Sequence, residues 1–177
     1  PTVLISREET LEITVMFADV VAFTPLAEKL PPEQVVQILN ELFTIVTEIV
    51  FRHGGTVDKF IGDCVMAVFG APRTQPDHAV RAVAAAEDMQ RFVEAQAPAW
   101  RKDFGFEVRL GIGIGSGEAV VGNLGSAARM EYTAIGDVVN VAARLESLAR
   151  PGQTLVTAEG AAQVASGFHF APLGQVE

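Results

Sequence analysis

The 177-residue chain has one cysteine, one tryptophan, one tyrosine and three histidines. Its single cysteine, Cys64, excludes an internal disulfide, and His53, His78 and His169 are too scattered to form a zinc site. Basic residues are also few, with 13 Lys and Arg against 22 Asp and Glu, and the net charge of −9 argues against general binding to nucleic acid or to an anionic membrane surface. No uninterrupted apolar run approaches the roughly 18 residues of a membrane-spanning helix. We therefore expect a cytoplasmic protein with no nucleic-acid partner and no direct membrane contact.

The length and the 49% share of hydrophobic residues suit one domain, residues 1–177, with a core of its own. The chain begins at Pro1, without an initiator methionine, and stops soon after a Leu-Gly pair. We read it as part of a longer protein, and we expect the last strands of its fold to lie beyond Glu177.

Hydrophobic periodicity predicts an alternation of strands and helices. The predicted strands are 11–18, 56–61, 64–69, 107–114, 118–121, 130–135 and 154–157, and the predicted helices are 32–52, 77–98 and 137–148. Gly62-Asp63 suits the two-residue turn of a hairpin. The order strand, helix, hairpin, helix, strand is the split βαβ or ferredoxin-like arrangement, an α+β fold with helices on one face of an antiparallel sheet.

Two acidic residues stand where this fold would bring them together. Asp19 ends the first predicted strand and Asp63 lies at the tip of the predicted hairpin. Alone, each is well explained as a helix cap or a turn former. Together, at neighbouring strand ends, they are hard oxygen ligands of the kind that Mg²⁺ takes when substrate phosphates and water complete its shell.

Three further features have an ordinary structural explanation. Lys59 alternates with Val57 and Ile61, which places a cation on the same side of its strand as two apolar residues and suits a snorkelling lysine. Asn140 and Arg144, four residues apart, share the polar face of the last predicted helix, an ordinary solvated surface unless a partner chain covers it. The glycine run 111–117 lacks the Gly-Lys-Ser/Thr of a phosphate loop, so it favours close backbone approach instead.

Four segments in order resemble the class III nucleotidyl cyclase catalytic domain. They are residues 17–24 (FADVVAFT), 57–63 (VDKFIGD), 109–113 (RLGIG) and 132–144 (YTAIGDVVNVAAR). The resemblance spans residues 11–160. One departure is Ala22, which stands where the family usually has glycine.

The resemblance implies a homodimer with two active sites, each shared between the chains. One protomer would hold two Mg²⁺ or Mn²⁺ ions and the triphosphate of ATP. The matching residues are Asp19, Asp63 and the Val20 backbone for the metals, and Phe23, Thr24 and Arg109 for the phosphates.

The other protomer would supply the base-reading and catalytic residues. Lys59 and Thr133 match the pair that reads the purine, Asn140 the residue that orients the ribose, and Arg144 the cation that stabilises charge at the transferring phosphorus. Family members that use GTP have Glu and Cys at the base-reading positions, and many that use ATP have Lys and Asp. Lys with Thr is similar to the bacterial adenylyl type, so the resemblance implies an adenylyl cyclase that makes cyclic AMP and pyrophosphate.

Three other functions remain as alternatives. A guanylyl cyclase is disfavoured by Lys59, and a catalytically silent module that binds nucleotide or dimerises is disfavoured because each motif position carries a chemically competent residue. An RNA-binding ferredoxin-like domain is disfavoured by the net charge and by the lack of a basic, aromatic strand surface.

Overall fold

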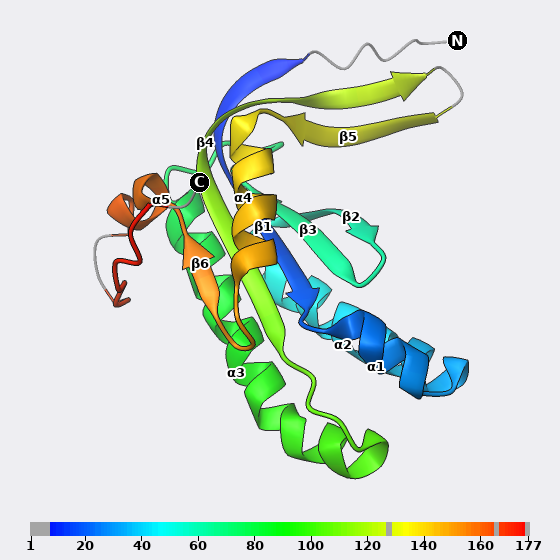
Figure 1. The fold of residues 1–177 in the computed structure, drawn as a ribbon. Helices are drawn as coiled ribbons and strands as arrows, with labels where there is room; N and C mark the ends of the chain where they lie inside the picture. The colour runs from blue at the N-terminus through cyan, green and yellow to red at the C-terminus, as the bar shows by residue number, and fades with distance from the viewer. Residues whose placement is uncertain (1–7, 127–128, 165–166, 176–177) are drawn as a thin grey trace.

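The computed structural model describes residues 8–126, 129–164 and 167–175. The main strands and helices follow the predicted order (Figure 1), and two short helices, α1 and α5, add to the three that the periodicity predicts. In chain order they are β1 (Glu9–Val20), α1 (Phe23–Lys29), α2 (Pro32–Arg52), β2 (Thr56–Ile61), β3 (Cys64–Phe69), α3 (His78–Phe104), β4 (Leu110–Ser126), β5 (Arg129–Ile135), α4 (Asp137–Leu148), β6 (Thr154–Val156) and α5 (Ala158–Ala162).

One sheet runs through the molecule in the strand order β2-β3-β1-β4-β5, and β6 adds to β4. All pairs on this path are antiparallel, whereas β6 runs parallel to β4. The first four strands of the fold thus have the order β4-β1-β3-β2 that a split βαβ arrangement requires, so the predicted α+β architecture is confirmed. The pairing of β1 with β3 is the feature that brings the end of the first strand to the hairpin tip.

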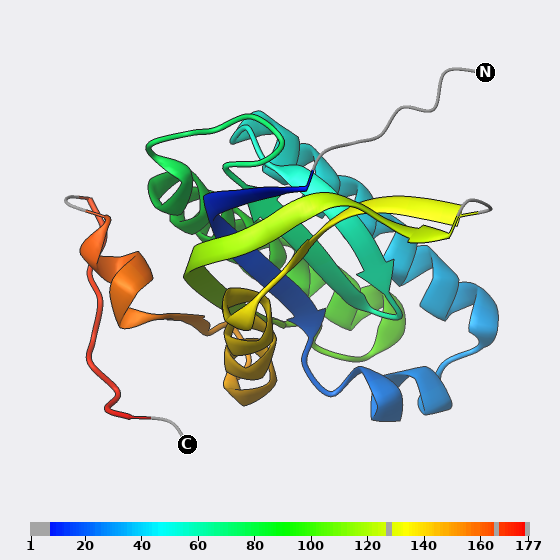
Figure 2. The same ribbon diagram turned by 90° about the horizontal axis from the view of Figure 1, so that it is seen from above.

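The helices lie on both faces of this sheet (Figures 1 and 2). The sequence predicts helices on one face only. Helices α2 and α3 do lie on one face, where they form the larger of two apolar clusters with the sheet. By contrast, α4 packs on the opposite side, where its Val138 and Ala142 join a second cluster. Alternation along β1 supplies both clusters, with Met16 and Ala18 facing α2 and α3 and with Phe17 facing the side of α4.

Close packing of α4 depends on the glycine run of β4. A Cβ on Gly113 would lie 2.3 Å from the Ala142 carbonyl oxygen and 2.3 Å from the Glu146 nitrogen. The glycine run therefore allows the backbone of α4 to approach the sheet closely, as predicted. The run lies in a paired strand and not in a phosphate loop.

Two elements, β4 and α3, differ from the prediction by more than two residues at an end. The predicted strands 107–114 and 118–121 form one strand, β4, because β1 pairs with it continuously from Leu110 to Val121. Helix α3 does not end near Pro98 but continues to Phe104. The extra turns are held by Trp100, which is 1% exposed and donates its indole N–H to Glu41 of α2 at 3.1 Å. This burial outweighs the hydrogen bond that proline removes from the helix.

Helix α2 is the one helix in the described ranges that is long and apolar enough to cross a membrane, judged by length and composition. Its buried residues Ile38, Leu42, Val46, Ile49 and Val50 all belong to the cluster with α3 and the sheet. Core packing accounts for these five residues, whereas Val36 and Phe51 of the same helix are 55% and 62% exposed.

Candidate active site

Asp19 and Asp63 meet at one end of the sheet. Asp19 is the penultimate residue of β1 and pairs with Cys64 of β3, so the hairpin residue just before Cys64 comes to lie beside it. The two carboxyl groups are close enough to share a hydrogen bond, and the backbone amide of Val20 interacts with both. The structure therefore brings together the two acidic residues that the sequence predicted.

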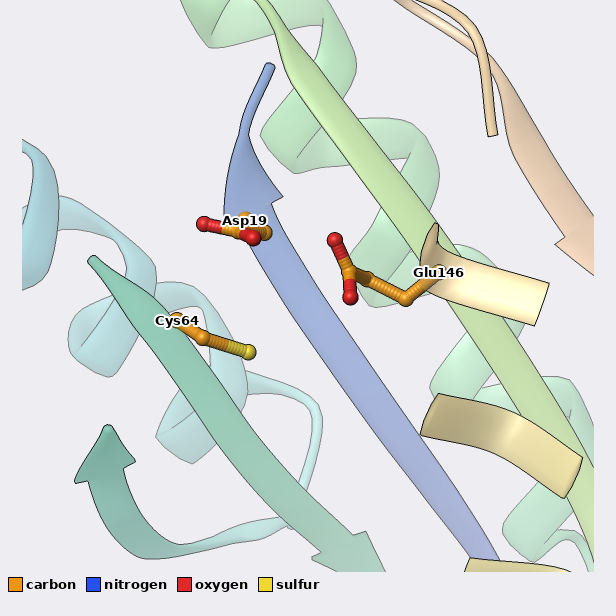
Figure 3. A group of neighbouring side chains, drawn as sticks. All are labelled: Asp19, Cys64 and Glu146. Atoms are coloured by element: carbon orange, nitrogen blue, oxygen red, sulfur yellow. The ribbon is translucent and has the colours of Figure 1, made fainter. Parts of the chain in front are cut away.

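Glu146 of α4 is a third acid at this position (Figure 3). A carboxylate oxygen of Asp19, the Cys64 sulfur and a carboxylate oxygen of Glu146 all lie within 4.8 Å of one another. Glu146 is not among the residues predicted from the sequence. A signal was present, because Glu146 follows the buried Val138 and Ala142 at intervals of four residues, which places an acid on the helix face that packs on the sheet.

Burial and mutual repulsion raise the pKa of each acid. Burial raises the pKa of Asp63 to about 7, and the hydrogen bond and charge of Asp19 add to the shift. Burial likewise raises the pKa of Asp19 and of Glu146, which also repel other acids of the group. Such a group of carboxylates is unfavourable without a cation and is typical of a functional site.

A divalent cation fits this group. The Oδ1 atom of Asp19 is buried and has no hydrogen-bond partner among the described residues. Carboxylate oxygens suit Mg²⁺ or Mn²⁺. Cys64 is a poor ligand for these cations, because its sulfur is a soft donor and Mg²⁺ and Mn²⁺ prefer oxygen. Burial also raises the pKa of its thiol to about 12.

The turn after β1 is held against the start of β4. The Val21 amide donates to the Arg109 carbonyl at 2.9 Å, so the backbone of Arg109 lies next to the turn that follows Asp19. Its guanidinium lies 3.8 Å from Glu107, facing a pocket beside α3 that Glu94 also lines. Phe23 begins α1 and packs against the main core, and the side chain of Thr24 lies outside the described part of the chain.

Ala22, at the start of α1, has φ 60° and ψ 36°, and it is the one non-glycine residue with positive φ in the described ranges. This left-handed conformation favours glycine, which explains the glycine that the family usually has here.

The segments that carry Lys59 and Thr133 come together, although β2 and β5 lie at opposite ends of the strand order. The β4–β5 ribbon passes over the β2–β3 hairpin (Figure 2), and the Thr133 hydroxyl donates to Asp58 Oδ2 at 2.7 Å. Lys59 Nζ lies 3.9 Å from Glu131, two residues before Thr133. Lys59 and Thr133 thus lie in one region of a single chain, each in contact with the strand that carries the other.

A β-bulge in β2 corrects the expected orientation of Lys59. The register shifts between Val57, which pairs with Ala67, and Lys59, which pairs with Met66. Ala67 and Met66 belong to the clusters on opposite faces of the sheet. Lys59 therefore does not share a side with Val57, because the extra residue, Asp58, interrupts the alternation.

Asn140 and Arg144 are exposed on α4, as predicted. Val141, which the sequence assigned to the apolar stripe, is 42% exposed on the same helix.

The family model described as the adenylate and guanylate cyclase catalytic domain matches residues 5–177. The chain belongs to this family. The class III cyclases that it comprises bind nucleotides, use divalent metal ions and typically dimerise.

Relatives within the family include both nucleotide specificities. Adenylate cyclase 1 of Rhizobium meliloti (strain 1021) is 42% identical over 165 residues, which is 92% of this chain and 25% of that protein. The solved adenylyl cyclase CyaB of P. aeruginosa is 37% identical with a TM-score of 0.86, covering 89% of this chain and 82% of that one. The solved guanylyl cyclase Cya2 is 34% identical with a TM-score of 0.87, covering 96% and 89%. The backbone of a class III cyclase domain thus does not by itself distinguish ATP from GTP.

This chain spans about a quarter of the length of the curated relatives that it matches.

Proposed function

We propose that the chain is the catalytic domain of a cytoplasmic adenylyl cyclase, which converts ATP to 3′,5′-cyclic AMP and pyrophosphate. The observation that supports the proposal is that one chain carries two separate polar clusters, which we interpret as half-sites. One is the acidic group of Asp19, Asp63 and Glu146, and the other is the cluster of Lys59 and Thr133. A metal-dependent enzyme that reads a purine needs both.

The proposed reaction is an intramolecular displacement. The ribose 3′-oxygen bonds to the α-phosphorus, and the bond from that phosphorus to the oxygen that bridges to the β-phosphorus breaks. The proton of the 3′-hydroxyl passes to water, and pyrophosphate leaves. Two Mg²⁺ or Mn²⁺ ions, when bound, lower the pKa of the attacking hydroxyl and neutralise the triphosphate. Asp19, Asp63 and the Val20 backbone are the proposed ligands, and Phe23, Thr24 and Arg109 are the proposed contacts of the triphosphate.

The second half-site is proposed to come from a partner protomer. Asn140 would orient the ribose, and Arg144 would place a fixed cation where negative charge grows, an effect worth about 3–4 kcal/mol for comparable groups. The exposure of both residues on α4 supports this arrangement, because neither is engaged in the core of its own chain. A homodimer would then contain two such shared sites.

Selection of ATP is proposed to rest on Lys59 and Thr133. The lysine ammonium can donate to adenine N1, and the threonine oxygen can accept from the 6-amino group. Guanine presents a donor at N1 and an acceptor at O6, which makes it a poorer match. Guanylyl cyclase activity is the second candidate, because the solved guanylyl cyclase Cya2 matches this backbone as well as the adenylyl cyclases do.

The test is product identification with ATP and GTP as competing substrates in the presence of Mg²⁺ or Mn²⁺, at protein concentrations that favour dimers. We expect cyclic AMP as the main product, and Asp19→Ala should remove nearly all turnover. Faster formation of cyclic GMP would establish the second candidate. Nucleotide binding without either product would instead identify a silent module.

A further inference from the structure

Asp58 lies beside the base-reading pair but is not part of it. It occupies the bulge of β2, and this extra residue lets Asp58 and Lys59, neighbours in sequence, both reach β5. Bulges next to active sites commonly re-aim side chains in this way. The contact between Asp58 and Thr133 joins segments 75 residues apart.

The direction of the hydrogen bond defines what Thr133 can do. A carboxylate can only accept, so the proton of the Thr133 hydroxyl points to Asp58 Oδ2 at 2.7 Å. Both lone pairs of the hydroxyl oxygen are then left to accept from another group. A threonine without this partner could rotate its hydroxyl and either donate or accept.

The surroundings of Asp58 are unusual for a group that only fastens two strands. Its Oδ1 atom is buried and has no hydrogen-bond partner among the described residues. The residue faces a small hollow between β2 and β5, lined also by Thr56, Val121, Tyr132 and Ala134. A neutral side chain would join the strands without burying an unpaired acceptor.

We propose that Asp58 is a positioning residue for nucleotide specificity, which fixes Thr133 as a hydrogen-bond acceptor. The inference rests on the proposed function, because it names the group that makes the base-reading pair choose ATP. The 6-amino group of adenine donates to the fixed Thr133 oxygen. The O6 atom of guanine meets an acceptor there and is rejected, because the hydroxyl proton is already engaged.

The test compares kcat/KM for ATP and for GTP in Asp58→Asn. The amide nitrogen of asparagine can donate to Thr133 and release its proton, so we expect the ATP to GTP ratio to fall about tenfold or more. The double variant D58N/T133D places the acceptor on β5 directly and should restore the preference for ATP. Asp103→Asn, the same chemical change at an exposed site in α3, should keep the wild-type ratio.

An equal loss of activity on both nucleotides in D58N, or an unchanged ratio, would mean that Asp58 only joins two strands, and would overturn the inference. If D58N does not fold by circular dichroism, Asp58→Ser carries the test, because its hydroxyl can also donate to Thr133. Failure of the proposed function would look different, since the wild-type chain itself would then form no cyclic AMP or would prefer GTP.

Discussion

The carboxylates of the acidic group are needed for metal binding but lower the stability of the metal-free protein. At pH 8 without metal, Asp63 is above its pKa of about 7 and its charge repels Asp19. The raised pKa means that the native state binds more protons than the unfolded state below pH 7, so stability falls as the pH rises from about 4 to 7. Because Asp63 is only partly buried, solvent screening reduces this cost to ~1 kcal/mol.

Asp63→Asn should therefore be more stable than the wild type at pH 8 in EDTA, while its cyclase activity is lost. Millimolar Mg²⁺ should raise the Tm of the wild type and have little effect on the variant. Thermal unfolding by circular dichroism, with and without metal, measures both effects. An equal metal response in the two proteins would show that Asp63 does not bind the cation.

Ala22 offers a second test at the scale of one residue. Its left-handed conformation costs an alanine about 1–2 kcal/mol, more than the extra chain entropy that a glycine loses on folding. Ala22→Gly should raise the free energy of unfolding by ~0.5 kcal/mol, whereas the same change at the exposed Ala99 within α3 should lower it by ~1 kcal/mol. Denaturant unfolding of both variants checks the sign, and a loss at Ala22 would contradict the argument.

The sequence predicts which residues belong to the candidate site better than it predicts their neighbours and orientation. Asp19 and Asp63 were accessible from sequence because each ends a clear strand and the fold class makes those strands neighbours. Glu146 was not found because a stripe was assembled only from apolar residues, although its spacing from Ala142 places it on the buried face. The prediction that Lys59 shares a side with Val57 is wrong because strict alternation does not anticipate a bulge, whereas Lys59 does share a side with Ile61.

At the scale of the elements, the contact between α4 and β4 controls the site. Gly113→Ala would force a methyl group into the backbone of α4 at 2.3 Å. The helix would have to shift, and Glu146 would move away from Asp19. We expect a loss of about 3 kcal/mol or more in stability, measured by denaturant unfolding.

Gly117→Ala is the matched control, because it lies on the same strand and face. Its Cβ would meet Val138 at 3.7 Å, which is ordinary contact. Equal destabilisation by the two changes would mean that glycine is needed for the strand itself rather than for the helix above it.

Element types were predictable from periodicity, but their ends depended on tertiary contacts. Helix α2 and the β2–β3 hairpin have the predicted bounds because Pro, Gly and charged residues punctuate them. The continuation of α3 past Pro98 depends on the burial of Trp100 against α2, and the length of β4 depends on its pairing with β1. The sequence around Pro98 and β4 does not indicate that α2 and β1 will pack there.

For the whole molecule, shared sites make a distinctive prediction about mixtures. Asp63→Ala and Asn140→Ala, each nearly inactive alone, would damage opposite halves of a shared site. Random mixing should restore roughly a quarter of wild-type activity, because half of the dimers are mixed and each mixed dimer keeps one intact site. Cyclic AMP formation in mixed samples measures this recovery.

A mixture of Asp63→Ala with Asp19→Ala should not recover, since both changes affect the same half of the site. Recovery in that mixture, or none in the first, would contradict sites built from two chains.

The placement of the two bulky fluorophores has a practical consequence. Trp100 is sealed between α3 and α2, whereas Tyr132, the sole tyrosine, is 38% exposed in β5 next to Thr133. Fluorescence of Trp100 should therefore follow global unfolding. Fluorescence of Tyr132 should respond when a ligand binds next to Thr133 in the β4–β5 ribbon. The native chain thus carries an internal optical reference and an optical sensor, with no label required.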